Sequence, residues 1–547
     1  MHSVRSRPLF RLLLASLVSG LLLTVVPASF ADDPDSQGSA DATETDDGGV
    51  VAPDGVDPGE VVARDIADEE VCPVPPPPNG VDFRGPNVWN GPDSQVASAP
   101  TPPAMGAWDN LWDFQTVGYS EPWGTEPWQF ASGFARLICG AAQGADVKIG
   151  MYFIRALQNG SAQPEYGANA IYDALEWVKV HRDAKVSIIL EGMNSCLLVP
   201  AGASCTEAMA SSNVRELVAE RWESIGDVIY CINGCMNATA FGTNFFGISH
   251  EKFIAISDTI WPNPNPGTGP DPSVHPLVVS SSTNWARSQM RSYVQDAMFI
   301  YDDHLLWKEF DERFDVLRSC AMDRCALAKA HQANPADPKN ATLKVTNQGT
   351  DGVWASSVYR RATDSGKGTE LIFSPQYSTH QNAYVNQLDQ VNCAVDDEVR
   401  VAMFSMTEGL AETMANRLVA LKRAGCDVDV LLSRPGGGRS LSPKVTSTLN
   451  NAGISYACAA RSMHTKLILI GPKGRAGSVM EGTQNMSLSG QFYSDEHIIS
   501  LKPHNVSRPG YRQAMADVYL HYKNSFDVLK RLRDETGKTA SKGLCNA

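Results

Sequence analysis

The chain has 547 residues, of which 43% are hydrophobic and 20% are charged, and its formal net charge is −15. The charge is unevenly spread: segment 32–70 accounts for −13 and segment 1–31 for +3, which leaves −5 for residues 71–547. A body so close to neutral gives no support to a nucleic-acid groove, which needs clustered Lys and Arg.

The first 103 residues precede the part of the chain that is expected to fold. Residues 1–31 are typical of a secretory signal peptide, with three Arg, an apolar stretch over 12–26 and a small-residue cleavage site. No later apolar run reaches the roughly 18 residues that a membrane span needs, so we expect a secreted protein without a transmembrane segment. Residues 32–103, acidic at first and then rich in Pro, are expected to be disordered or extended.

The remaining chain is too long for one ordinary core, so we expect two domains, over 104–335 and 336–547. In the first, the pattern predicts a helix over 130–142, a strand over 147–154, a helix over 170–181, strands over 185–190, from His250, over 278–284 and over 297–301, and a helix over 304–320. The second repeats this order, with a helix over 381–391, a strand over 399–404, a helix over 410–424, strands over 427–432, from His464, over 479–485 and over 497–501, and a helix over 511–533. The repeated alternation predicts an internal duplication of an α/β sandwich.

Twelve Cys, an even number in an exported chain, indicate disulfides. Three pairs could close local loops: Cys196–Cys205, Cys231–Cys235 and Cys320–Cys325. Other pairings stay open. A metal cluster is the alternative for the second pair. Export favours oxidation, and no His stands at zinc-finger spacing from it, so we favour the disulfide.

Each half carries a His-x-Lys motif at the start of a buried strand, followed by a short element that ends in Asn. The residues are His250, Lys252, Ser282 and Asn284 in the first half, and His464, Lys466, Thr483 and Asn485 in the second. Side chains two apart on a strand point the same way, so each imidazole should lie beside an ammonium group and form an anion site. Two half-sites of this kind predict one composite active centre between the domains. A third copy, His521-Tyr522-Lys523, falls in a predicted helix and is interpreted as chance.

These paired motifs resemble those of the phospholipase D superfamily, and the resemblance covers roughly residues 130–320 and 370–535. The chain departs from the family where an Asp often follows the Lys by five residues, because Ser257 and Gly471 stand there. The two Asn elements also vary, with Ser281 in place of the usual Gly and Thr483 in place of the usual Ser.

An acid that orients the His commonly follows the Asn by about eleven residues in this family. Glu496 stands there in the second half. In the first half that place is Gln295, with Asp296 next to it. The resemblance therefore implies Glu496 and Asp296 as the orienting acids, with the first half less well matched.

The resemblance implies a phosphodiesterase that uses a phosphohistidine intermediate and needs no metal ion or other cofactor. It assigns His250 as nucleophile and His464 as general acid, and the reverse assignment stays open. The two Lys and two Asn would compensate charge on the phosphate oxygens, and Ser282 and Thr483 would add hydroxyl contacts.

We expect a secreted, monomeric enzyme that hydrolyses phospholipid headgroups at a membrane or micelle surface, or transfers them to other alcohols. A secreted nuclease of the same superfamily is the main alternative, disfavoured because the chain has no basic run. A catalytically silent binding protein with this fold is the third. Four Trp precede the first motif: Trp108, Trp112, Trp123 and Trp128. For them, core packing or a covering loop is favoured over lipid anchoring.

Overall fold

The computed structural model describes residues 71–73, 104–109, 111, 128–152, 154–155, 166–191, 223–231, 234–235, 248–261, 271–286, 289–290, 293–321, 368–374, 382–407, 409–433, 441–472, 476–487, 490–491, 494–503, 506, 509–534 and 537–546. The predicted signal peptide, nearly all of segment 32–103 and the boundary predicted at 335/336 lie outside these residues.

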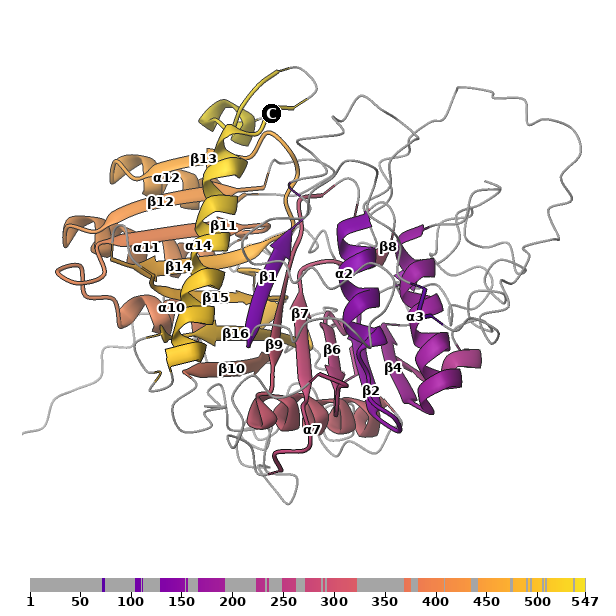
Figure 1. Ribbon diagram of the computed structural model, residues 1–547. Coiled ribbons are helices and arrows are strands. Elements are labelled where there is room, and N and C mark those ends of the chain that lie inside the picture. The colour runs from indigo at the N-terminus through magenta and orange to yellow at the C-terminus, as the bar shows by residue number, and fades with distance from the viewer. Residues whose placement is uncertain are drawn as a thin grey trace, which may run out of the picture.

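The first half forms a seven-stranded mixed sheet with strand order β1-β9-β7-β6-β2-β4-β5 (Figure 1). Its strands are Met105–Asp109 (β1), Asp146–Met151 (β2), Lys185–Glu191 (β4), Asp227–Cys231 (β5), Lys252–Ile256 (β6), Leu277–Ser281 (β7) and Asp296–Tyr301 (β9). Strands β2, β4 and β5 run parallel, and the other neighbours pair antiparallel. A separate two-stranded pair joins Ile154–Arg155 (β3) to Trp285–Ala286 (β8).

The second half repeats this topology strand for strand, in the order β10-β16-β15-β14-β11-β12-β13. Its strands are Thr369–Ser374 (β10), Glu398–Met403 (β11), Asp427–Leu432 (β12), Ser455–Cys458 (β13), Lys466–Gly471 (β14), Ser478–Gly482 (β15) and Glu496–Leu501 (β16). The parallel and antiparallel pairings fall at the same places in the order. The predicted fold class, two similar α/β domains, is confirmed.

Helices cover both faces of each sheet. Their bounds are Trp128–Cys139 (α2), Tyr166–Arg182 (α3), His304–Ala321 (α7), Ala383–Asp389 (α10), Leu410–Arg423 (α11), Pro443–Asn451 (α12) and Pro509–Arg531 (α14), and a 3₁₀ helix, η6, spans Lys542–Asn546. Helices α2 and α3 pack on one face of the first sheet and α10 to α12 on the outer face of the second (Figure 1). The inner faces, with α7 and α14, share one apolar core, so the two halves are packed against each other.

The strands at the centre of both sheets are buried along their whole length, because both faces are covered. All five residues of β6 and all six of β14 are buried. Their near-continuous runs of branched apolar residues are what such burial requires. Only the first residue of each run, Lys252 or Lys466, carries a charge.

Four disulfides lie within the described residues: Cys72–Cys139, Cys231–Cys235, Cys393–Cys426 and Cys458–Cys545. The predicted Cys231–Cys235 pair is therefore confirmed. Cys320 is disulfide-bonded, but its predicted partner Cys325, like the predicted Cys196–Cys205 pair, lies outside the described residues.

The described part of the chain contains no helix that is both long and apolar enough to cross a bilayer. Trp108 is buried and packs its ring on Phe130, Phe134 and Phe299, so for this residue the core interpretation holds. Trp112, Trp123 and the side chain of Trp128 lie outside what the structure describes.

Candidate active site

The two His-x-Lys motifs meet at the interface between the halves. The His250 and His464 rings lie 6.3 Å apart between centroids and are inclined by 75°. Both side chains are buried, as are Lys252 and Lys466. Each His stands two residues before its strand rather than lying in it, because β6 and β14 begin at the Lys.

Backbone pairing across the interface holds each His in place. Two isolated parallel bridges join the halves, one between Ser249 and Asp495 and one between Val294 and Met463. The His250 N–H donates to the Asp495 carbonyl oxygen at 2.9 Å, and the His464 N–H donates to the Val294 carbonyl oxygen at 2.8 Å. Each imidazole is thus positioned by the half that does not contain it.

The Nδ1 atoms of the two rings have chemically different partners. His250 Nδ1 lies 2.8 Å from Glu496 Oε2. His464 Nδ1 lies 2.7 Å from the carbonyl oxygen of Ser282. Glu496, which the resemblance implies as an orienting acid, therefore contacts the His of the opposite half, and its orienting role stays a prediction.

An aromatic ring lies against each imidazole and ammonium pair. In the first half the Tyr152 ring is 4.9 Å from the His250 ring, and Lys252 Nζ lies 5.2 Å from its centroid. Lys252 Nζ also donates to the His250 carbonyl oxygen at 3.1 Å. These contacts hold the ammonium beside the imidazole, as an anion site needs.

The second half repeats the arrangement with Phe404. Its ring is 4.4 Å from the His464 ring, and Lys466 Nζ lies 4.9 Å from its centroid. Lys466 Nζ donates to the His464 carbonyl oxygen at 2.8 Å. Sequence reasoning missed both aromatic residues, although a residue-by-residue comparison of the halves finds them, since each directly follows an equivalent strand, β2 or β11.

The predicted Asn and hydroxyl residues lie just beyond β7 and β15, and all four are buried. The hydroxyls are engaged with the neighbouring strand: Ser282 Oγ accepts from the Asp296 N–H at 2.9 Å, and Thr483 Oγ1 accepts from the His497 N–H at 3.0 Å. These bonds fix the turns that carry Asn284 and Asn485. A phosphate contact from Ser282 or Thr483 stays a prediction.

The strand registers show which residues are equivalent in the two halves. Ser281 pairs with Ala297, and Gly482 pairs with Ile498. Ala297 and Ile498 are therefore equivalent. One residue earlier, Asp296 is the equivalent of His497, and two residues earlier, Gln295 is the equivalent of Glu496. Gln295 accepts from Ser282 Oγ at 3.0 Å, so this amide supports the turn whose carbonyl contacts His464.

Asp296 is buried close to the second motif. Burial raises the pKa of the Asp296 carboxyl, although the neighbouring Ser282, Thr465 and Lys466 act in the opposite direction. Burial and the proximity of Asp296 also raise the pKa of Glu481 well above its usual range. An orienting role for Asp296 stays a prediction.

The third His-x-Lys sequence lies on α14. His521 Nε2 is 3.2 Å from Asp109 Oδ2 on β1, and Lys523 Nζ contacts the Glu398 carboxylate at 2.6 Å. Both side chains therefore tie elements together. Within the described residues, no group of three or more His, Cys, Asp or Glu is arranged to hold a metal ion.

No protein-family model and no curated protein matches the sequence. Among solved structures, the chain is similar to phosphatidylserine synthase from Haemophilus influenzae Rd KW20, with 9% identity, a TM-score of 0.45, and coverage of 76% of this chain and 86% of that one. It is also similar to polyphosphate kinase from Porphyromonas gingivalis, with 12% identity and a TM-score of 0.41, over 80% of this chain but only 50% of the kinase. Nuc from Salmonella typhimurium, a phospholipase D family member, matches at 16% identity and a TM-score of 0.23, over 30% of this chain and 94% of its own.

Proposed function

We propose that the chain is a secreted phosphodiesterase of the phospholipase D type, which releases the headgroup alcohol of a phospholipid through a phosphohistidine intermediate. One observation carries the proposal: two buried imidazoles, one from each half, face each other at 6.3 Å between centroids, each beside a Lys ammonium. A phosphoryl group between them would meet one ring on the attacking side and the other on the leaving side.

The Nδ1 partners distinguish the roles. The Glu496 carboxylate accepts from His250 Nδ1–H, so Nε2 carries the lone pair, and the carboxylate stabilises the positive charge that this ring gains on bonding to phosphorus. The Ser282 carbonyl accepts from His464 Nδ1–H. A neutral carbonyl stabilises an imidazolium less than a carboxylate does, so His464 gives up its Nε2 proton more readily. His250 is accordingly the nucleophile and His464 the general acid.

In the first step a bond forms between His250 Nε2 and phosphorus while the bond from phosphorus to the alcohol oxygen breaks. The proton on His464 Nε2 passes to the departing oxygen. In the second step His464 takes a proton from water, the water oxygen bonds to phosphorus, and the bond to His250 breaks. Lys252 and Lys466 compensate charge on the non-bridging oxygens throughout.

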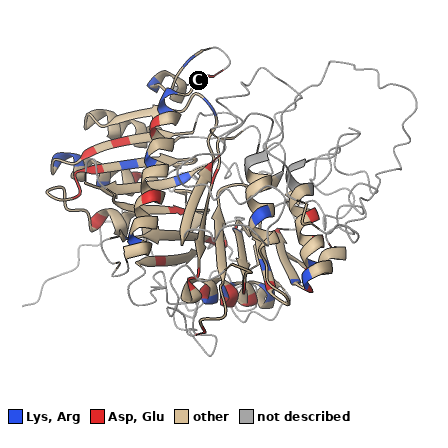
Figure 2. Ribbon diagram, viewed as in Figure 1, with Lys and Arg blue, Asp and Glu red and all other residues tan. Residues whose placement is uncertain are grey.

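A phospholipid is favoured as substrate over a nucleic acid for an electrostatic reason. Residues 71–547 carry a net charge of only −5 and contain no run of Lys or Arg. Both signs are interspersed where charges are frequent, as along α7 (Figure 2). Binding a polynucleotide would need clustered cations, whereas one phosphodiester needs only the two Lys of the site.

The test is release of choline from phosphatidylcholine vesicles by the purified protein, with chelator and a primary alcohol present. We expect choline together with a new phosphatidyl alcohol, since a covalent intermediate can be intercepted by either acceptor. Cleavage of DNA or RNA with intact vesicles would favour the nuclease alternative. Binding of these diesters without turnover would favour the catalytically silent one.

A further inference from the structure

A second His–carboxylate pair lies directly beside the first, and the proposed reaction does not use it. His497 Nδ1 lies 2.6 Å from Glu251 Oε2, and both side chains are fully buried. Because Glu251 follows His250 and His497 follows Glu496, both pairs join residues 246 positions apart. The two pairs are therefore formed by consecutive residues of the same two segments, one from each half.

Further buried contacts extend this pair in both directions. On one side, Arg313 Nε and Nη2 contact Glu251 Oε1 at 2.9 and 2.8 Å, and Nη2 donates to the Ser374 carbonyl oxygen at 2.7 Å. On the other side, Ser280 Oγ lies 2.9 Å from His497 Nε2 and 2.8 Å from Glu481 Oε2. Four of these links cross between the halves: Arg313 to Ser374, Glu251 to His497, His497 to Ser280 and Ser280 to Glu481.

The direction of the central hydrogen bond follows from the charge of Glu251. Burial raises the pKa of this carboxyl, but the Arg313 guanidinium and His497 outweigh it, and the net effect lowers the pKa. An ionised carboxylate can only accept, so His497 Nδ1–H donates to it. Such a charge-assisted bond in a buried network is stronger and better fixed than a neutral one.

We infer that Glu251 and His497 are positioning residues, whose hydrogen bond fixes β16 against the segment 249–251 so that Glu496 reaches His250 Nδ1. The inference rests on the proposed function, because it explains how the nucleophile is oriented. Glu496 and His497 are adjacent on β16, so a displacement of one displaces the other. Without the hydrogen bond between Glu251 and His497, only the backbone bridge between Ser249 and Asp495 would hold Glu496 in register with His250.

Two amide substitutions separate the contacts of the imidazole. The side-chain nitrogen of Asn occupies the place of Nδ1, and that of Gln the place of Nε2. His497→Asn therefore keeps a donor for Glu251, and His497→Gln keeps only the contact with Ser280. With bis(4-nitrophenyl) phosphate as substrate, we expect His497→Gln to lower kcat by about 10- to 100-fold, with little change in KM. The acidic limb of its pH profile should also move, while His497→Asn stays close to wild type.

Tyr511→Phe is the matched control. Tyr511 on α14 donates to the carbonyl oxygens of Tyr301 and Asp302 in the other half, both at 3.0 Å. Its loss weakens the same interface away from the histidines, so it should lower the melting temperature and leave kcat unchanged. A fall in kcat here equal to that of His497→Gln would overturn the positioning role.

A spectroscopic measurement separates failure of this inference from failure of the proposed function. The Nδ1–H proton resonance of His250, identified by its loss in His250→Ala, should persist in His497→Asn and broaden through solvent exchange in His497→Gln. Equal spectra and equal kcat in the two His497 variants would overturn the inference, as would equal losses in both. If wild type cleaves no diester but the resonances behave as expected, the proposed function fails and the positioning role stands.

Discussion

The histidines of the paired motifs occupy equivalent places in the two halves but differ in the contacts of Nδ1, which at His464 include Lys466 Nζ at 3.2 Å. A carboxylate lies at Nδ1 of His250, and a backbone carbonyl lies at Nδ1 of His464. If these contacts set the roles, the two rings should respond differently to a substrate whose leaving group needs no proton.

With bis(4-nitrophenyl) phosphate, we expect His464→Ala to release one equivalent of 4-nitrophenol in a burst and then stall as the phosphohistidine. 4-Nitrophenolate departs without a general acid, whereas the second step needs His464 to activate water. His250→Ala should give no burst. Rapid-quench release and ³¹P NMR of the trapped enzyme measure both outcomes. A burst in His250→Ala alone would reverse the assignment, and His521→Ala, on α14, should behave as wild type.

The buried carboxyl of Glu481 gives a prediction about stability and pH. Its pKa is held well above 4.5 by burial and by Asp296. The folded state then keeps a proton that the unfolded chain has lost, so the free energy of unfolding falls as pH rises above about 4.5 and until it reaches the folded-state pKa. Glu481→Gln cannot ionise, and its unfolding free energy should fall less between about pH 5 and pH 8.

Urea unfolding of wild type and Glu481→Gln at several pH values measures this difference. Glu251→Gln is the control of opposite sign, because the pKa of Glu251 is lowered. Its contribution is present above the unfolded-state pKa and is lost as pH falls through the folded-state pKa. Removing it should therefore cost most at neutral pH. Parallel pH dependence in wild type and Glu481→Gln would contradict the raised pKa of Glu481.

The sequence predicts the residues that carry the proposed chemistry better than those that support them. His-x-Lys followed by Asn is a local pattern that appears twice, so it can be read directly. The partnership of Glu251 with His497 depends on how the halves pack, and no local pattern encodes it. Tyr152 and Phe404 stand at equivalent places but differ in kind, so only a residue-by-residue comparison of the halves finds them and no repeated motif marks them.

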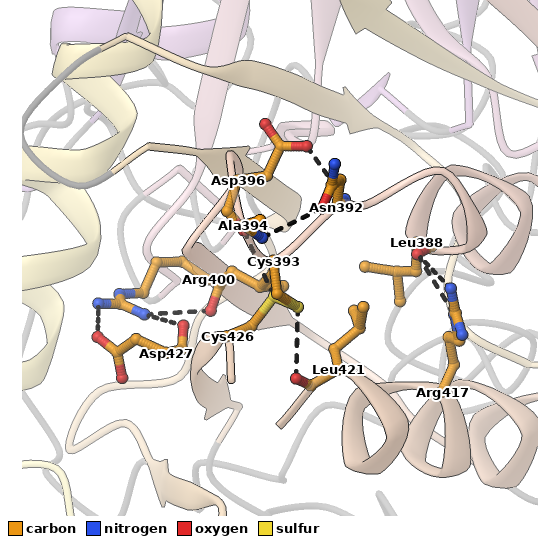
Figure 3. The surroundings of a disulfide bond; sticks show 11 residues. Leu388, Asn392, Cys393, Ala394, Asp396, Arg400, Arg417, Leu421, Cys426 and Asp427 are labelled. Carbon is orange, nitrogen blue, oxygen red and sulfur yellow. Dashed lines mark hydrogen bonds and ion pairs between the residues drawn. A yellow bond between two sulfur atoms is a disulfide. The ribbon is translucent and has the colours of Figure 1, made fainter. Parts of the chain in front are cut away.

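At the scale of elements, the Cys393–Cys426 disulfide joins the segment before β11 to the start of β12 and encloses α11 (Figure 3). The double variant Cys393→Ser/Cys426→Ser should lower the free energy of unfolding by about 2–4 kcal/mol, because the unfolded chain regains the freedom of a 33-residue loop. Guanidinium unfolding measures the loss.

Activity should survive that change, because the length of β11 separates the disulfide from the site, where Met403 pairs with Lys466. Val395→Ala, at an exposed neighbour, should alter neither quantity. A loss of activity at unchanged stability would show that the disulfide acts on the site and not on the unfolded state.

The predicted elements that match best are the long periodic helices and the buried strands. The pattern placed the helix over 304–320 within one residue of α7, and the strand over 427–432 matches β12. Strands β1, β5, β10 and β13, all four of them at sheet edges, are not predicted from the sequence. Edge position depends on pairing with distant residues, as when β1 pairs with β9, and a short strand gives little periodicity of its own.

At the scale of the whole molecule, the apolar core between the sheets belongs to both halves. Phe310 on α7 packs against Phe373 on β10, with ring centroids 5.5 Å apart, and α14 packs against β1. We therefore expect a single calorimetric unfolding transition. Phe310→Ala should destabilise the whole by about 3–5 kcal/mol and shift that transition without splitting it. Two resolved transitions in wild type would show that the halves unfold independently.

The reciprocal pairing of His250-Glu251 with Glu496-His497 also limits how such chains can recombine. A chimaera that joins the first half of this protein to the second half of a relative would inherit one dipeptide without its complement. His250, the proposed nucleophile, would then lie beside an unmatched Glu251. Substitutions at 251 and 497 should therefore be inherited together, although a whole sheet and its helices separate them in the chain.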